Sequence, residues 1–149
     1  MVSINSLEEH QFVTGLGGDA LWLGGRRDPT NRQTWFWSDG TPWGYTNWAQ
    51  NEPNDNGGNS DCSLIRLSGN DWGDKKCSQL RTFVCKKGKN LSPAQITSTP
   101  TAIPAQPECQ VDWPEYNGEC YKFFPEKKNY HDAKTECVAE TVRRSLSNL

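Results

Sequence analysis

The sequence has no excess of positive charge and no long apolar segment. Its 149 residues include 16 Lys and Arg against 18 Asp and Glu, which gives a formal net charge of −2. Nucleic-acid-binding proteins place a surplus of basic residues against the phosphate backbone, so we expect no nucleic-acid partner. No apolar run approaches the roughly 20 residues that cross a bilayer as a helix. We therefore expect no membrane span in this segment.

The amino-terminal residues also lack the pattern of a secretory signal, which is a basic segment followed by an apolar one. Only 34% of the residues are hydrophobic, so the core would be thin and would gain from covalent cross-links. The six cysteines include no Cys-x-x-Cys pair, which disfavours structural zinc and favours disulfides formed outside the cell. These features together predict an extracellular chain, as a piece of a longer secreted or ectodomain protein.

Motifs for catalysis are missing as well. The two histidines, His10 and His131, stand in no nucleophile motif. The sequence has no His-Glu-x-x-His pair for zinc and no glycine-rich phosphate loop. We therefore expect the chain not to be an enzyme.

Composition divides the chain into three blocks. Residues 1–88 are rich in tryptophan and glycine and form the main block. Residues 89–107 are dominated by Pro, Ser, Thr and Ala, a composition that predicts an extended linker, and Asn90 begins an N-glycosylation sequon at its edge. Residues 108–149 contain too few apolar residues to fold alone.

In the main block, turn residues separate short segments with clear preferences. Ser6 and Glu9 form a capping-box pattern that predicts the start of a helix, and Gly15 predicts its end. Aromatic or β-branched runs predict strands at 21–23, 35–37, 63–67 and 82–86. Residues 41–61 form a long loop, in which Trp43, Tyr45 and Trp48 favour an ordered structure. We expect Trp43 and Trp48 to pack the loop rather than to stack on a sugar.

In the last block the pattern predicts a hairpin followed by a helix. The hairpin would lie within residues 109–124. Asn129 is a typical residue for the start of a helix, and Tyr130, Ala133 and Cys137 would then share one helical face.

Seven short segments of the main block follow one another in a characteristic order. They are Leu21-Trp22-Leu23-Gly24-Gly25, Trp37-Ser38-Asp39-Gly40-Thr41-Pro42, Thr46-Asn47-Trp48, Glu52-Pro53-Asn54-Asp55, Asp61-Cys62, Trp72-Gly73-Asp74 and Phe83-Val84-Cys85. In this order they resemble the C-type lectin-like domain family. The resemblance implies an α+β fold of the C-type lectin-like kind, with a long loop region and disulfides. Residues 1–88 resemble the C-terminal two-thirds of one such domain and residues 108–149 the N-terminal third of a second, as in tandem-domain lectins.

The resemblance also implies a disulfide pattern, Cys62 with Cys77 and Cys109 with Cys120. Cys85 and Cys137 then lack the partners they have in the family. One alternative is that the last block docks back onto the main block, as a permuted domain closed by a Cys85–Cys137 bond. A linker of about 20 extended residues, at roughly 3.1 Å each, is long enough for that. The other alternative is that both thiols stay free.

Glu52-Pro53-Asn54 resembles the family's calcium-dependent site for sugars of the mannose, fucose or N-acetylglucosamine type. The resemblance implies that Glu52, Asn54 and Asp74 would bind both the metal and the sugar, with Pro53 in a cis peptide bond. Calcium takes six to eight oxygen ligands, so two can come from neighbouring sugar hydroxyls. An auxiliary calcium site would use Asp28, Asp55 and Asp61.

Three departures from the family pattern weaken both metal sites. Ser60 stands where sugar-binding members carry a glutamate ligand, and Gly73 stands where they carry an asparagine. Arg32 occupies a position where an acid is expected, and a cation there repels calcium or replaces it with an internal salt bridge.

Two functions follow from these matches and departures. One is a mannose-type carbohydrate-binding module that depends on calcium, provided that the weakened site still binds the metal. The other is an interaction module that kept the lectin scaffold and binds protein or glycan without calcium. The acidic loop has a simpler interpretation too, as solvated Asp and Asn residues that make turns.

Overall fold

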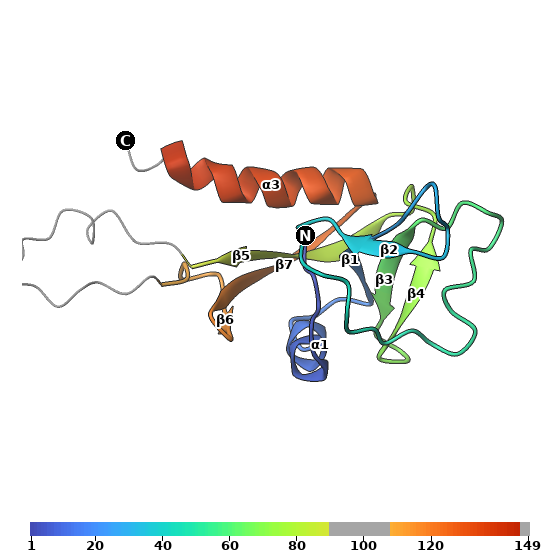
Figure 1. Ribbon diagram of the computed structural model, residues 1–149. Helices are drawn as coiled ribbons and strands as arrows, with labels where there is room; N and C mark the ends of the chain where they lie inside the picture. The colour runs from blue at the N-terminus through green and yellow to red at the C-terminus, as the bar shows by residue number, and fades with distance from the viewer. Residues whose placement is uncertain (90–107, 147–149) are drawn as a thin grey trace, which may run out of the picture.

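The computed structural model describes residues 1–89 and 108–146 (Figure 1). The sequon at Asn90 and almost all of the predicted linker lie outside the described residues. The mixture of helix and sheet confirms the predicted α+β class. In order along the chain, the elements are α1 (Leu7–Thr14), β1 (Ala20–Arg27), β2 (Trp35–Trp37), β3 (Cys62–Arg66), β4 (Asp71–Lys75), β5 (Arg81–Gly88), β6 (Glu115–Tyr116), β7 (Glu119–Lys128) and α3 (Tyr130–Leu146).

The strands form one sheet with the order β4-β3-β1-β5-β7-β6, and β2 pairs with β1 beside this path. The β1–β5 pair is parallel and the other strand pairs of the described residues are antiparallel. The sheet therefore includes strands from both the main block and the last block of the sequence.

Helix α1 begins as its capping box predicts. The Ser6 hydroxyl accepts a hydrogen bond from the Glu9 amide at 3.1 Å, and the Glu9 carboxylate accepts one from the Asn5 amide at 2.7 Å. The other Glu9 oxygen accepts from Lys86 Nζ on β5 and from Tyr121 Oη on β7, both at 2.6 Å. One buried carboxylate thus joins the helix cap to two strands.

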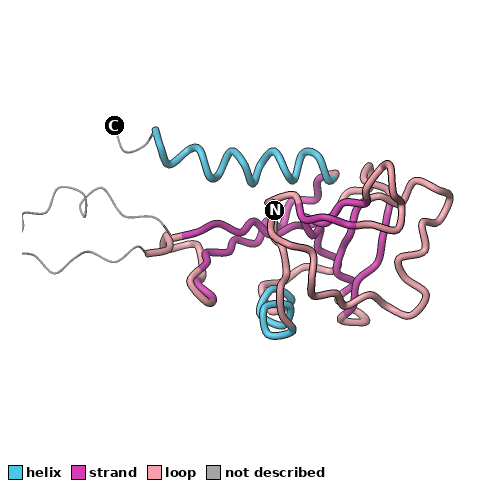
Figure 2. The backbone as a smooth tube through the Cα atoms, in the orientation of Figure 1, coloured by secondary structure: helices cyan, strands magenta, loops and turns pink. Residues whose placement is uncertain are grey.

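The last block docks on the main block through β7, which pairs with β5. In this pairing Phe83 lies opposite Phe124, and their rings stack with centroids 4.8 Å apart. Helix α3 runs along one face of the sheet (Figures 1 and 2), and a disulfide between Cys85 and Cys137 fastens it to β5. The structure therefore contains the cross-block bond and not the free thiols. The remaining cysteines form the bonds Cys62–Cys77 and Cys109–Cys120.

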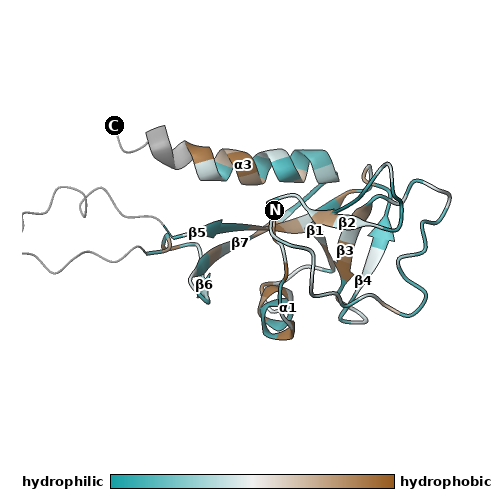
Figure 3. Ribbon diagram, viewed as in Figure 1, coloured by the Kyte–Doolittle hydropathy of each residue, from teal (hydrophilic) through white to brown (hydrophobic). Residues whose placement is uncertain are grey.

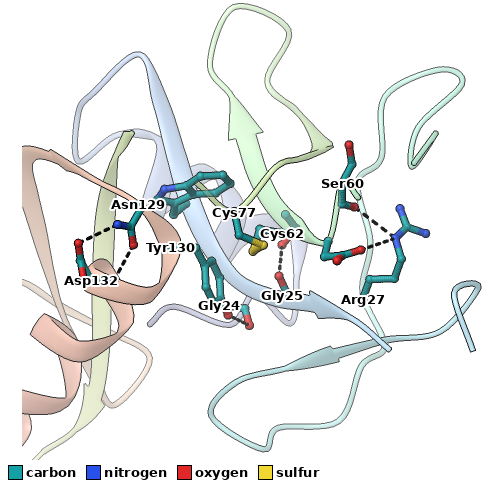
Figure 4. Close-up of a disulfide and its surroundings, with 12 residues drawn as sticks. Gly24, Gly25, Arg27, Ser60, Cys62, Cys77, Asn129, Tyr130 and Asp132 are labelled. Atoms are coloured by element: carbon teal, nitrogen blue, oxygen red, sulfur yellow. Dashed lines mark hydrogen bonds and ion pairs between the residues drawn. A yellow bond between two sulfur atoms is a disulfide. The ribbon is translucent and has the colours of Figure 1, made fainter. Parts of the chain in front are cut away.

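Helix α3 begins directly after Asn129. The Asn129 Oδ1 atom accepts a hydrogen bond from the Asp132 amide at 2.9 Å, and Tyr130 Oη donates to the Gly24 carbonyl at 3.0 Å (Figure 4). Tyr130, Ala133 and Cys137 are buried, as expected for one apolar face.

The core has two parts, one on each face of the sheet. Successive side chains of a strand point to opposite faces. Accordingly, Trp22 belongs to the cluster under α3, whereas its neighbours Leu21 and Leu23 pack in the cluster that includes Val13 of α1. Figure 3 shows that the hydrophobic residues gather on the central strands. Within residues 1–89 and 108–146, no helix is long and apolar enough to cross a membrane.

Candidate functional site

The long loop is anchored by tryptophan rings. Trp72 on β4 accepts a hydrogen bond at its carbonyl from the Ala49 amide at 2.9 Å, and its indole donates to His10 Nδ1 at 3.2 Å. Trp43 lies 4.3 Å from Trp37, and Trp48 lies 4.9 Å from Trp35, measured between ring centroids. The rings therefore pack the loop, as predicted, and hold it against β2 and β4.

The three side chains predicted to bind the sugar come together at one end of β4. The Glu52–Pro53 peptide bond is cis. The side-chain Nδ2 of Asn54 donates to Glu52 Oε1 at 3.0 Å. The backbone amide of Asn54 donates to Asp74 Oδ1, also at 3.0 Å. The loop and the strand thus bring Glu52, Asn54 and Asp74 within direct hydrogen-bonding distance of one another.

Arg27, at the end of β1, forms an ion pair with the Asp74 carboxylate. Its Nη2 atom pairs with Asp74 Oδ2, which also accepts from the Asp55 amide at 2.7 Å. Arg27 Nε donates to the Ser60 carbonyl at 3.2 Å (Figure 4), and the guanidinium lies 4.6 Å from the centre of the Trp35 ring. Both Asp74 oxygens are therefore engaged by protein donors.

We did not predict this role of Arg27, although the sequence contains a signal for it. Leu21, Leu23 and Gly25 occupy alternate, buried positions of β1, and Arg27 is the next position in that series. A basic residue on the buried face of a strand requires a nearby acid, because an unpaired buried charge is very costly.

Glu52 lies over the position where the family carries an asparagine. A Cβ atom added to Gly73 would lie 3.6 Å from Glu52 Cδ, and the Glu52 side chain is only 7% exposed. Lys75 Nζ is 3.8 Å from Glu52 Oε1. The Glu52 side chain therefore lies against Gly73 and is almost completely buried.

Burial and hydrogen bonding shift the pKa values of this pair in opposite directions. Burial raises the pKa of Glu52 above its ordinary value, and a hydrogen bond with the Asp74 side chain acts in the same direction. Burial alone would also raise the pKa of Asp74. Hydrogen bonds from Glu52 and from the Asn54 and Asp55 amides, together with the charge of Arg27, outweigh this effect and lower the pKa of Asp74.

At the predicted auxiliary site a second arginine bridges two of the three acids. Arg32 Nε and Nη2 donate to the two oxygens of Asp55 at 2.7 and 2.6 Å, and Nη2 also donates to Asp61 Oδ1 at 2.7 Å. This bridge lowers the pKa of Asp55 below its ordinary value. Asp28 takes no part, since its Oδ1 accepts from the Thr30 amide and hydroxyl, both at 2.7 Å.

The oxygen atoms at these two predicted sites are not arranged to bind a calcium ion. Asp55, Asp61 and Asp74 already face guanidinium groups, and Ser60 Oγ donates to the Asn56 carbonyl at 3.2 Å. A metal would have to displace two arginines before it could gather six or more oxygens. In the part of the chain that the structure describes, no three His, Cys, Asp or Glu side chains are grouped to hold a metal.

Residues 1–87 match the family described as "Lectin C-type domain". The chain belongs to this family. It is 31% identical to the C-type mannose receptor 2 of Homo sapiens over 142 residues, which are 93% of this chain and 9% of the receptor. It is 38% identical to the low affinity immunoglobulin epsilon Fc receptor of Mus musculus over 89 residues, 58% of this chain and 26% of that protein. The chain thus spans about a tenth of the mannose receptors that it matches.

A solved structure with similarity to this C-type lectin domain is the C-type lectin CEL-I from Cucumaria echinata. The identity is 29%, the TM-score is 0.46, and the match covers 50% of this chain and 58% of CEL-I. These relatives are receptors and lectins rather than enzymes.

Proposed function

We propose that this chain is an extracellular carbohydrate-binding module that works without calcium. The observation that carries the proposal is the pair of arginines in the long-loop region. Arg27 neutralises Asp74, and Arg32 bridges Asp55 and Asp61. The acids that would bind calcium therefore hold the loop through ion pairs within the protein.

A guanidinium is suited to this role because it presents several donors in a rigid plane. Arg27 uses Nε, Nη1 and Nη2, which donate to the Ser60 carbonyl, the Arg32 carbonyl and the Asp74 carboxylate. The positive charge that holds these groups belongs to a side chain of the protein and not to a metal ion that can dissociate. A loop organised in this way keeps its shape when metal is absent. It can therefore bind a ligand in the presence of a chelator such as EDTA.

Calcium titration and glycan binding in chelator test the proposal. We expect no saturable heat when calcium is added by calorimetry up to about 10 mM, well above the range of extracellular calcium modules. The thermal unfolding midpoint should be equal in calcium and in EDTA, and a glycan array should keep its positive spots in EDTA. A saturable calcium isotherm, a glycan signal abolished by EDTA, or an array with no binding at all would each overturn the proposal.

A calcium-dependent mannose-type site is the second candidate, and the Glu52–Asn54 pair favours it. Asn54 is exposed and its amide lies 3.0 Å from Glu52 Oε1, next to the cis Pro53 bond. On this candidate the chain would bind mannose, fucose or N-acetylglucosamine and would elute from mannose-agarose with EDTA. Glu52→Gln combined with Asn54→Asp should shift its preference toward galactose. Failure of the chain to bind mannose-agarose in calcium would remove this candidate.

Protein ligands are an alternative to glycans on the same surface. The chain is 29% identical over 107 residues to the secretory phospholipase A2 receptor of Homo sapiens, whose name, like that of the immunoglobulin epsilon Fc receptor, refers to a protein ligand. A negative array together with protein binding in EDTA would favour this alternative.

A further inference from the structure

A polar cleft lies beside the long loop, and no described carboxylate lines it. Its volume is about 230 Å³, and its walls are the turn at residues 56–60 and the end of β4 with the segment that follows it. The residues that line it are Asn56, Gly57, Ser60, Lys75, Lys76 and Gln79. Two lysines therefore line a small space together with polar, uncharged residues.

The positive charge of this cleft is only weakly compensated. Lys75 Nζ is 3.8 Å from Glu52 Oε1, which is beyond a short charge-assisted hydrogen bond. Lys76 is exposed and forms no ion pair with any residue in 1–89 or 108–146. Asp55 and Asp61, which belong to the same loop region, are bridged by Arg32. Asp55 and Asp61 therefore face Arg32, and Glu52 is the only acid among residues 1–89 and 108–146 that forms an ion pair with a lysine of the cleft.

The walls of the cleft are fixed by bonds within the protein. Ser60 Oγ donates to the Asn56 carbonyl at 3.2 Å and closes the turn on one side. On the other side, Cys77 follows Lys76 directly and is joined to β3 by the Cys62–Cys77 disulfide. Arg81 Nη2 donates to Gln79 Oε1 at 2.8 Å, so the Gln79 amide nitrogen remains as a donor for a ligand.

We propose that this cleft binds an anionic substituent of a sugar, a sulfate or a carboxylate, so that the preferred glycan is acidic. The inference rests on the proposed function, because it names the ligand class of the same module. Lysine ammonium groups act as compact positive charges that attract an oxyanion, and amide donors complete its hydrogen bonds. A sugar held here would lie next to Asn56 and Lys75, close to the Glu52 end of the loop.

The test uses three forms of one oligosaccharide, neutral, sulfated and carboxylated, with binding measured in EDTA. We expect the acidic forms to bind at least tenfold more tightly than the neutral form, and to weaken as salt rises. The ratio between the sulfated and carboxylated forms identifies the source of the anion. Lys75→Gln with Lys76→Gln should lower the affinity for the acidic forms at least tenfold more than the affinity for the neutral form, so that the preference for acidic forms is lost.

The matched control is Lys127→Gln with Lys134→Gln, which removes the same charge from exposed positions on β7 and α3. This control should retain the preference for acidic forms and share the thermal midpoint of the wild type. Equal affinity for acidic and neutral forms in EDTA would overturn this inference and leave the proposed function standing. An acidic preference that needs calcium but still depends on Lys75 and Lys76 would overturn the proposed function and keep the cleft.

Discussion

Arg27 and Asp74 form an ion pair inside the protein, with side chains that are 4% and 0% exposed. The pair joins the end of β1 to β4 directly beneath the long loop. Asp74 also accepts hydrogen bonds from the amides of Asn54 and Asp55, so the same carboxylate holds the loop backbone. Sheet and loop are therefore connected through one neutralised acid.

Replacing Arg27 with Met should destabilise the protein strongly. The change leaves Asp74 buried without its counter-charge, and breaking such a pair costs about 3–5 kcal/mol. Urea unfolding followed by tryptophan fluorescence measures the loss. The control is Arg66→Gln, which removes the half-exposed pair with Asp71 and should cost at most about 1 kcal/mol. Equal losses in the two variants would contradict the role given to Arg27.

The Arg32 bridge should make stability depend on pH in the acid range. Because Arg32 lowers the pKa of Asp55 in the folded state, the bridge stabilises the protein above the ordinary Asp pKa of about 3.9. That contribution is lost as pH falls through the lower, folded value. Arg32→Gln should therefore lower the thermal midpoint at pH 7, and the difference from the wild type should shrink toward pH 3. A difference that stays constant over this range would argue against the bridge.

The disulfide between the two blocks should stabilise the fold more than the small disulfide of the last block. Cys85 and Cys137 are 52 residues apart, against 11 for Cys109 and Cys120. Loop-closure entropy then gives about 4 kcal/mol for the first and about 3 kcal/mol for the second. Guanidinium unfolding of the two double Cys→Ala variants compares them. The order would be wrong if the Cys109–Cys120 variant were the less stable one.

Restoring the family's ligands should create a calcium site. The variant combines Arg32→Glu, Ser60→Glu and Gly73→Asn with Arg27→Ser, which frees Asp74. We expect calorimetry to detect calcium with a dissociation constant of about 10⁻³ M or lower. The same variant with Arg27 retained should bind much more weakly, because the guanidinium keeps Asp74. Equal affinity with and without Arg27 would show that Arg27 does not compete with the metal.

Local sequence patterns were sufficient to predict most of the helices and strands. Ser6 and Asn129 mark the helix starts because short polar side chains bond to nearby amides, and both act in that way here. The strand at β4 was missed, since Gly73 and Asp74 have low strand preference and are held by pairing with β3. The division into two partial domains stays a prediction, although the match to the human mannose receptor 2 extends over 93% of the chain.

The site was harder to predict than the fold, because its chemistry depends on which charges meet. The sequence predicted that Glu52, Asn54 and Asp74 share one site, and the structure places them together. Their binding role stays a prediction. It also raised an internal salt bridge at Arg32 as one alternative. The ion pair of Arg27 with Asp74 was missed because the two residues are 47 positions apart in the sequence. Only the pairing of β1 with β3 and of β3 with β4 brings them together.

The ring cluster around Trp72 gives the loop an optical signature. Trp43 and Trp48 come from the loop, and their rings lie about 6 Å from the Trp72 ring of the sheet, at 6.1 and 5.8 Å. Indole chromophores at such spacing couple electronically, so near-ultraviolet circular dichroism should report whether the loop stays packed on the sheet. The three rings thus give a label-free signal for the conformation of this loop.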